Sequence, residues 1–354
     1  MVLMALDHAN FHISQQHSSG EYWGGPFPVF STPMQFLVRF VTHLCAPGFF
    51  FTLGIGMVLF TSSRSKKGWN ESKIWGHFLV RGFVLIALQI ILNYGQVWSV
   101  AGSPALRWYV GVLAALGFGM ILCVPLLRLK PKYLAWISLG LFVIMEVLTP
   151  DALLWGKNFD QFAGTLLIFS GGIGEFWSNY PLLAWVELIV LGILFGKLIL
   201  EDARTAYQNG AWLGLIFLTG FGLLRALNGF GNIRPLPKDN WMGFLSLVKY
   251  PPSMTFVLLT IGINLILLWA FSKVKEPIFG EMNPLLVYGR APLFFYLAHV
   301  WVYLLMGRLI TPEGSNLAVM FVLWLVGLFI LYIPVRWYGH FKSRQIATSW
   351  VRFL

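Results

Sequence analysis

Charged side chains are scarce in this sequence of 354 residues, where Asp, Glu, Lys and Arg together make up 11 %. Soluble globular proteins contain about 25 % charged residues. The composition therefore excludes an ordinary soluble enzyme, a disordered chain and a nucleic-acid-binding basic domain. Hydrophobic residues make up 57 % of the chain, and their runs are long and continuous, unlike the alternating segments of a β-barrel. We expect one all-α domain over residues 1–354, a polytopic transmembrane helix bundle.

Cysteines and acidic residues are also rare. The two cysteines, Cys45 and Cys123, lie in apolar runs, which argues against a disulfide framework. The 25 Lys and Arg residues outnumber the 14 Asp and Glu residues, for a net charge of +11. In a membrane protein such an excess is typical of basic cytoplasmic loops. The first residues lack the basic region and the small-residue cleavage site of a signal peptide.

Stretches of about 20 mostly apolar residues indicate membrane spans. We expect about ten spans, at residues 1–13, 35–61, 74–96, 108–127, 133–148, 182–200, 211–229, 252–272, 286–308 and 316–338. Every second loop is rich in Lys and Arg, which predicts that both termini face the cytoplasm. The segment 149–181 is the longest connection, and we expect an interfacial piece near 162–173.

One loop breaks the alternation of charge. The segment 230–251 is predicted to be external, yet it contains Arg234, Lys238 and Lys249. Basic residues outside the cytoplasm have no role in setting the orientation of the chain. This loop is therefore a candidate binding surface.

Ionisable residues within a membrane are costly and by default indicate function. Asp7 and His8 are neighbours on the first expected helix, where consecutive side chains point about 100° apart. Each must find a partner on another helix, such as Arg39, His43 or Arg225. His8 is a candidate general base or acyl-carrying nucleophile. The alternative for His8, and equally for His43, is an interhelical hydrogen bond that fixes packing.

The other polar residues are expected at two different depths in the membrane. A rise of 1.5 Å per residue puts His43, Arg225 and His299 in the outer half of the membrane, and Arg81 and Arg290 toward the cytoplasm. This predicts a polar cavity that opens outward, with basic groups on its inner side. We expect no metal site, because no carboxylate motif accompanies the histidines.

Five segments together resemble bacterial membrane proteins grouped with the catalytic domain of heparan-alpha-glucosaminide N-acetyltransferase. In chain order they read VLMALDHANF, THLCAPGFFFTLGIGM, YPLLAWVELIVLGILFGK, KYPPSMTFVLLTIG and PLLVYGRAPLFFYLAHVWV. The segments KYPPS and GRAPLFFYLAH are the most specific. The Asp-x-x-Arg-Gly stretch that usually precedes VLM in this family is absent. Together with the short first span, this predicts a missing N-terminal part.

The resemblance implies a transmembrane acyltransferase of the bacterial inner membrane. Such an enzyme takes an acetyl or other acyl group from acyl-CoA and gives it to a sugar or glycan acceptor on the external face. The family's catalytic histidine lies just beyond the first span, so His8, His12 and His17 are candidates, and His8 lies in the best-matching segment. The expected catalytic residues are His8, His43 and Asp7. Those expected to bind the donor's phosphates are Arg81 and Arg290, and those for the acceptor are Arg225, Lys249 and His299.

The alternative function is a small-molecule transporter or a non-catalytic membrane protein. Broken helices and charges in the membrane fit a transporter, but the inverted repeat of many transporters is not evident in the sequence. The expected partners are the lipid bilayer and a glycan acceptor, with no nucleic acid. A homodimer is left open.

Overall fold

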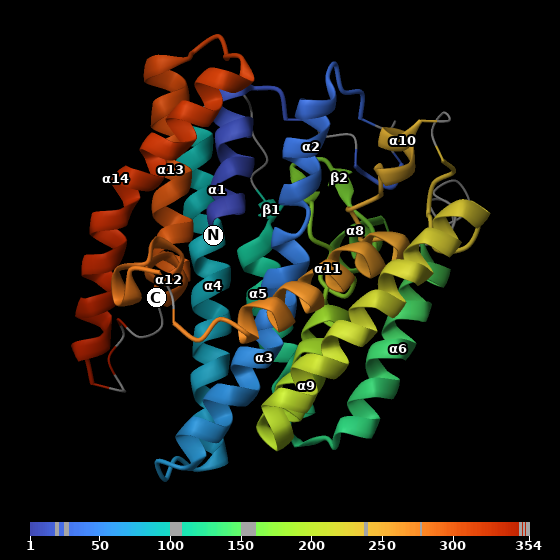
Figure 1. Cartoon of the computed structure of the whole chain (residues 1–354), viewed down its shortest axis with the longest axis vertical. Helices are drawn as coiled ribbons and strands as arrows, with labels where there is room; N and C mark the ends of the chain where they lie inside the picture. Colours follow the sequence, from blue (N-terminus) through green and yellow to red (C-terminus); the bar gives the residue numbers. More distant parts are fainter. Residues whose placement is uncertain are drawn as a thin grey trace. The chain divides into compact units, whose positions relative to one another are not determined.

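The computed structural model of the chain describes residues 1–17, 21–24, 28–99, 108–149, 161–236, 240–276, 278–346, 349 and 351. Its elements are labelled in Figure 1. The described part is mostly helical, as the sequence predicts. It groups into two compact units. Unit 1 contains Met1–Ser19, Val29–Cys45 and Lys273–Leu354, and unit 2 contains Gly20–Pro28 and Ala46–Ser272.

Unit 1 joins the two ends of the chain. Its elements are α1 (Val2–Ala9), the π-helix η1 (Asn10–Ser14), α2 (Pro33–Thr42), the 3₁₀-helix η3 (Gly280–Met282), α12 (Pro284–Arg290), α13 (Pro292–Ile310) and α14 (Leu317–Arg344). The helices α1, α13 and α14 pack side by side (Figure 1). Local chemistry fixes several helix starts. The side chain of Thr32 accepts a hydrogen bond from the N–H of Gln35 at the start of α2, and Asn316 caps α14 in the same way.

Unit 2 contains the central part of the chain. Its helices are α3 (Cys45–Ser65), α4 (Glu71–Ser99), α5 (Val112–Cys123), the 3₁₀-helix η2 (Pro125–Arg128), α6 (Pro131–Leu148), α8 (Gln161–Leu167), α9 (Val186–Leu227), α10 (Trp241–Leu245) and α11 (Met254–Ser272). The most extensive helix–helix contacts join α9 to α11, α4 to α5 and α6 to α9. A small sheet has the order β1 (Trp108–Val110), β3 (Phe176–Ser178) and β2 (Gly171–Ile173). Its β1–β3 pair is parallel and its β2–β3 pair antiparallel.

Glycines set the closest helix crossing in unit 2. A Cβ atom at Gly54 of α3 would lie 2.1 Å from the backbone oxygen of Ile189, and one at Gly192 of α9 would lie 2.0 Å from that of Phe51. Real Cβ atoms do not approach this closely, so the backbones of α3 and α9 meet where neither has a side chain. Gly56, two residues along α3, has nothing within 4 Å of its Cβ position. The close approach of α3 to α9 therefore depends on Gly54 and not on Gly56.

Six helical stretches of the described part are long and apolar enough to cross a membrane. They are Pro33–Ser65, Glu71–Asn93, Pro131–Leu148, Met254–Ser272, Pro292–Ile310 and Leu317–Arg344. They make the chain an integral membrane protein. Two further expected spans, 182–200 and 211–229, correspond to the 42-residue helix α9, which has non-helical backbone angles at Asp202. The count of ten and the orientation of the termini stay predictions.

Two expected spans differ in the structure. The first three residues of the expected span 108–127 form β1, and α5 has only 12 residues, because Gly111 is extended and Pro125 follows the helix. The expected span 286–308 is broken at Ala291, which has φ −131° and ψ 59°. Proline disfavours helical backbone in the residue before it and lacks the N–H that would continue the helix. Pro292 therefore starts a new helix, α13.

Candidate functional site

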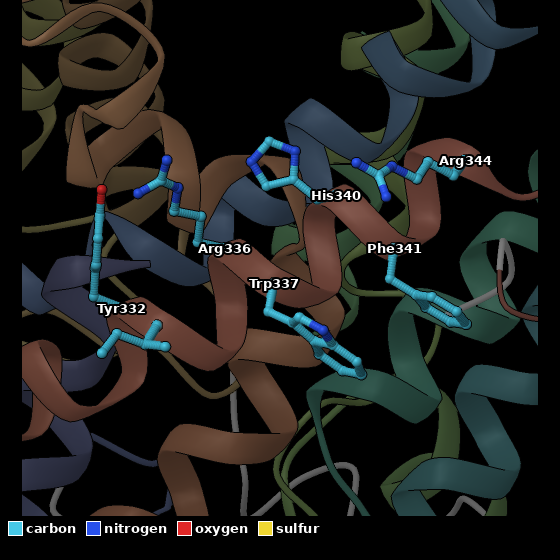
Figure 2. Close-up of a pocket in the computed structure, with 7 residues that line it drawn as sticks. Tyr332, Arg336, Trp337, His340, Phe341 and Arg344 are labelled. Carbon is cyan, nitrogen blue, oxygen red and sulfur yellow. The ribbon is translucent and has the colours of Figure 1, made fainter.

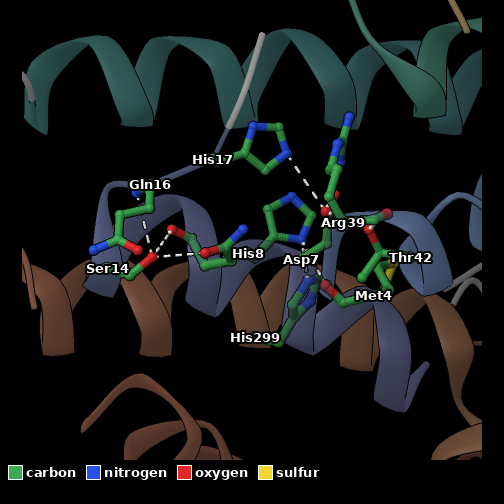
Figure 3. Close-up of polar contacts among 10 residues, drawn as sticks. Met4, Asp7, His8, Ser14, Gln16, His17, Arg39, Thr42 and His299 are labelled. Carbon is green, nitrogen blue, oxygen red and sulfur yellow. Dashed lines mark hydrogen bonds and ion pairs between the residues drawn. The ribbon is translucent and has the colours of Figure 1, made fainter. Parts of the chain in front are cut away.

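A pair of histidines from opposite ends of the chain lies in unit 1. His8 comes from α1 and His299 from α13, and Nδ1 of His8 lies 2.9 Å from Nε2 of His299 (Figure 3). The side chain of His299 is fully buried, while that of His8 is partly exposed. The ring of His12, one helical turn beyond His8, stacks on the His8 ring at 6.3 Å. The structure thus brings together three imidazoles, two of them 291 residues apart.

Backbone carbonyls assign the tautomers of this pair. Nδ1 of His299 lies 3.0 Å from the oxygen of Phe295, and Nδ1 of His8 lies 3.1 Å from that of Met4. A carbonyl oxygen only accepts hydrogen bonds, so both Nδ1 atoms carry the proton. The single Nδ1–H of His8 is then shared between the Met4 oxygen and Nε2 of His299, both of which accept. The neutral His8 ring consequently has its lone pair on Nε2.

Asp7 is held by α2. Its Oδ1 accepts hydrogen bonds from Nη1 of Arg39 and from the hydroxyl of Thr42, both at 2.7 Å (Figure 3). Nε2 of His17 lies 3.4 Å from the same oxygen. Arg39 is 2 % exposed and Asp7 21 % exposed at the side chain, so the ion pair is largely desolvated. The prediction that Asp7 and His8 find partners on different helices is confirmed.

A glycine permits the close approach that forms the histidine pair. A Cβ atom at Gly307 of α13 would lie 2.2 Å from the backbone oxygen of His12. This contact holds η1 against α13 two turns along from His299. Any side chain at Gly307 would push η1, and with it His8, away from α13.

His43 and Arg290 are the other expected site residues of unit 1. His43 is buried, 6 % exposed, at the C-terminal end of α2, and its backbone N–H donates to the oxygen of Phe40. Arg290 ends α12, where its Nη2 lies 3.5 Å from Oε1 of Glu281. The Arg290 side chain is half exposed.

Arg225 has a different environment, in unit 2. Its side chain is fully buried and donates to the backbone oxygens of Phe244, Gly243 and Ser246 and to Oδ1 of Asn232, at 2.5–3.0 Å. These acceptors belong to the loop that follows α9 and to α10. Arg225 therefore holds this loop in place, and its expected acceptor-binding role stays a prediction.

Lys249 lies in the same loop. It is 3 % exposed, and its Nζ lies 5.0 Å from the centre of the Tyr250 ring. The backbone N–H groups of Lys249 and Tyr250 both donate to the oxygen of Glu21. Burial lowers the pKa of Arg234 to about 10, against an opposing effect of the Glu21 carboxylate. The basic residues of this loop are thus packed into unit 2, except Lys238, which lies outside the described residues.

Two buried glutamates lie on α6 and α9. Oε2 of Glu146 accepts a hydrogen bond of 2.9 Å from the N–H of Met254, the first residue of α11. This carboxylate therefore caps a helix N-terminus. Glu187 is 3 % exposed, and no described residue donates a hydrogen bond to its Oε2.

Arg81 belongs to a basic and aromatic cluster between α3 and α4. The His77 ring stacks on Phe60 at 4.4 Å, and the Arg64 guanidinium lies 5.0 Å from the Phe60 ring and 5.1 Å from that of Trp69. Nε of Arg64 and Nε of Arg81 are buried, and no described residue accepts a hydrogen bond from either. An arrangement of this kind suits an anionic group with several acceptor oxygens.

An aromatic cluster in unit 2 gathers around one amide. Oδ1 of Asn179 accepts from the hydroxyl of Tyr22 and from the indole of Trp177, and its Nδ2 donates to the Tyr109 hydroxyl. The Tyr22 ring also stacks on Tyr250 at 5.3 Å. Sequence reasoning did not predict this cluster, in which Tyr109 comes from β1, Trp177 from β3 and Tyr250 from the loop before α11.

Thr42 was also missed from the sequence. The available signal was its spacing of three residues from Arg39, which puts both side chains on one face of α2. No group of three or more His, Cys, Asp or Glu side chains in the described part of the chain is arranged to hold a metal ion.

These features define a helical integral membrane protein with desolvated titratable groups inside its helix bundle. The family model described as heparan-alpha-glucosaminide N-acetyltransferase, catalytic, matches residues 26–223, more than half of the chain. The chain therefore belongs to this family, whose function is that of a membrane acetyltransferase-like enzyme. No curated protein was found to match the chain.

Proposed function

We propose that the protein transfers an acetyl group from acetyl-CoA to an amine or hydroxyl of a sugar or glycan acceptor on the external face, with His8 as the general base. The observation that carries this proposal is the hydrogen bond of 2.9 Å between His8 and His299. It supports a fixed imidazole whose lone pair is on Nε2, which is what a general base requires.

The proposed reaction uses His8 in a single proton transfer. Nε2 of His8 takes the proton of the attacking N–H or O–H as the new bond to the acetyl carbon forms. The thioester C–S bond breaks, and the CoA thiolate leaves. His8 then carries a proton on both nitrogens, and its Nδ1–H bond to His299 becomes charge-assisted. His299 acts on the acceptor only through His8, as a positioning residue.

Two separate sets of basic side chains, one in each unit, are proposed as alternative sites for the donor's phosphates. In unit 2, the buried Nε atoms of Arg64 and Arg81 support a phosphate contact, because no described residue accepts their hydrogen bonds. The flat rings of Phe60 and Trp69 beside Arg64 offer stacking surfaces for a nucleobase. In unit 1, Arg290 is half exposed and its ion pair with Glu281 is long, so a phosphate can displace the carboxylate.

The aromatic cluster around Asn179 is proposed as a sugar-binding surface of unit 2. Tyr22, Trp177 and Tyr109 present ring faces and polar edges together, which suits a sugar with apolar faces and hydroxyl rims. The buried Lys249 and Arg225 support the loop beside this cluster through Tyr250 and α10.

Acetyl transfer by the purified full-length protein tests the proposal. With acetyl-CoA and glucosamine, mass spectrometry should detect N-acetylglucosamine, and His8→Ala should lower the rate by about 10²–10⁴, as expected for loss of a general base. The melting temperature should change little, because interhelical hydrogen bonds in membranes contribute about 0.6 kcal/mol on average.

The matched comparison is His43→Ala, which removes the other imidazole that the sequence predicts to be catalytic. We expect this variant to retain most of the turnover. A full loss in His43→Ala with activity kept in His8→Ala would transfer the role of base to His43. Retained activity in both variants would remove the histidine site from the mechanism.

A transporter is the second candidate, favoured by the helix break between α12 and α13 at Ala291. Calorimetry separates the two functions. An acetyltransferase should bind acetyl-CoA, and Arg81→Gln or Arg290→Gln should weaken binding. Absence of any acyl-CoA binding by the folded protein would favour the transporter.

A further inference from the structure

The last turns of α14 form a groove on unit 1 that the histidine pair does not use. It has a volume of about 530 Å³ and is lined by Tyr332, Arg336, Trp337, His340, Phe341 and Arg344 (Figure 2). Its lining comes from α14 alone.

Two rows of side chains border this groove. Arg336, His340 and Arg344 are spaced by four residues and so follow one face of the helix over about 12 Å. Trp337 and Phe341 form the neighbouring row, and their rings stack at 5.6 Å with an angle of 5° between planes. One border is therefore basic and the other aromatic.

The basic row has no acidic counterpart. From Leu317 to Arg344, α14 contains neither Asp nor Glu, and in the described part of the chain no carboxylate pairs with the three basic side chains of the groove. A helix C-terminus attracts cations only within its last turn. Arg336 lies two turns before the end, so the helix dipole does not account for it. The groove therefore offers unneutralised positive charge to an anion.

An apolar stripe continues from the groove toward the middle of α14. Phe329 is 76 % exposed, Ile333 69 % and Trp337 63 %, and their spacing of four residues puts them on one face. The stripe is about 12 Å long, close to the thickness of one leaflet's hydrocarbon, about 15 Å. It lies where an acyl chain would follow a headgroup held at the basic row.

We propose that this groove binds an anionic glycerophospholipid, with its phosphate on Arg336 and Arg344 and one acyl chain along Phe329, Ile333 and Trp337. A free phosphate would contact the basic row alone, whereas a phospholipid would contact both the basic row and the apolar stripe. A zwitterionic lipid brings an ammonium group that finds no carboxylate on α14. The basic row thus selects a negatively charged headgroup, and the apolar stripe selects a ligand with an acyl chain.

Native mass spectrometry of the full-length protein in a neutral detergent tests this site. Phosphatidylglycerol should bind more tightly than phosphatidylcholine with the same acyl chains. Each Lys or Arg near an anionic surface contributes a factor of about five. The double substitution Arg336→Gln/Arg344→Gln should therefore weaken phosphatidylglycerol binding about 25-fold and leave phosphatidylcholine unchanged. Trp337→Ala should weaken both lipids.

The control removes the same charge elsewhere in unit 1. Lys273→Gln/Lys275→Gln, between α11 and η3, should leave the lipid preference intact. Equal affinity of the unsubstituted protein for both lipids would overturn the proposal, as would equal loss in the control pair. A concentration-dependent dimer that Trp337→Ala dissociates, with no lipid preference, would assign the groove to a second copy of the chain. Melting temperatures show that each variant is folded.

Discussion

The two units differ in what satisfies their buried charges. In unit 1, titratable side chains contact one another across helices, as Asp7 does with Arg39 and His8 with His299. In unit 2, the buried charges of Arg225 and Glu146 are satisfied mainly by backbone groups. Arg225 donates to three carbonyl oxygens, and Glu146 accepts from the N-terminus of α11.

This difference separates buried charges that fix the fold from those that can take part in proton transfer. A charge held by carbonyl or N–H groups fixes the path of a loop or the end of a helix, and its partners cannot change protonation. A titratable side chain held by another side chain can exchange a proton with it. We therefore locate the proposed base in unit 1 and regard Arg225 and Glu146 as organisers of unit 2.

The largest effect is expected from Arg225→Met, which tests the backbone-satisfied charge. The change leaves the oxygens of Phe244 and Ser246 and the Asn232 amide without their donor. Each buried unsatisfied group costs about 1–3 kcal/mol, so the free energy of unfolding should fall by about 4 kcal/mol. Thermal unfolding in detergent measures it. No single second substitution should restore stability, since three of the four acceptors are backbone oxygens. A variant as stable as the parent would break the contrast between the units.

The side-chain pair of unit 1 should behave differently. Arg39→Met leaves the Asp7 carboxylate without its cation and should lower the free energy of unfolding by about 3 kcal/mol. Adding Asp7→Leu should recover most of this loss, because replacing both partners of a buried ion pair by apolar groups is often neutral. A double-mutant cycle measures the recovery. Additive losses would show that Asp7 and Arg39 are stabilised independently.

Part of unit 1 was predictable from local geometry. The 100° offset between neighbours on a helix predicts separate partners for Asp7 and His8, and Arg39 was among three candidates for the role. The pairing of His8 with His299 was not predictable, because the two residues are 291 positions apart and nothing in either segment indicates that α1 packs on α13.

Two features of unit 2 were not predictable from the sequence. Arg225 reads as a functional residue because charges in apolar segments usually are, yet its acceptors are carbonyls of a loop, which no residue pattern reveals. The strand β1 was included in a span because a short apolar run such as Trp108–Val110 has no periodicity that separates strand from helix. Apolar length alone located most helices correctly.

Two glycine substitutions, one in each unit, compare the units at an intermediate loss of stability. Gly54→Ala in unit 2 and Gly307→Ala in unit 1 each put a methyl group against a backbone oxygen, and each should cost about 2 kcal/mol, as overpacking does. Only Gly307→Ala should also lower acetyl transfer, because it separates His8 from His299. Gly56→Ala is the control, with nothing near its Cβ position. Turnover lost equally in Gly54→Ala would show that the chemistry depends as much on unit 2.

The smallest expected effects come from two buried threonines. Thr42 in unit 1 donates its hydroxyl hydrogen bond to the Asp7 carboxylate, and Thr255 in unit 2 donates to the backbone oxygen of Gly231. Valine has nearly the same shape, so each Thr→Val change removes mainly the hydrogen bond. A bond to a charged group contributes about 1.5–3 kcal/mol, whereas neutral bonds in membranes average about 0.6 kcal/mol. After the Thr255→Val change, the Gly231 oxygen still accepts a hydrogen bond of 2.9 Å from the backbone N–H of residue 255.

Thr42→Val should therefore lower the free energy of unfolding by about 1.5 kcal/mol, and Thr255→Val by about 0.6 kcal/mol or less. Unfolding curves of the two variants at one detergent concentration measure the difference. If Thr255→Val is the more destabilising change, the hydrogen bond to the Asp7 carboxylate in unit 1 contributes no more than the bond to a backbone oxygen in unit 2. That outcome would contradict the contrast between the two units.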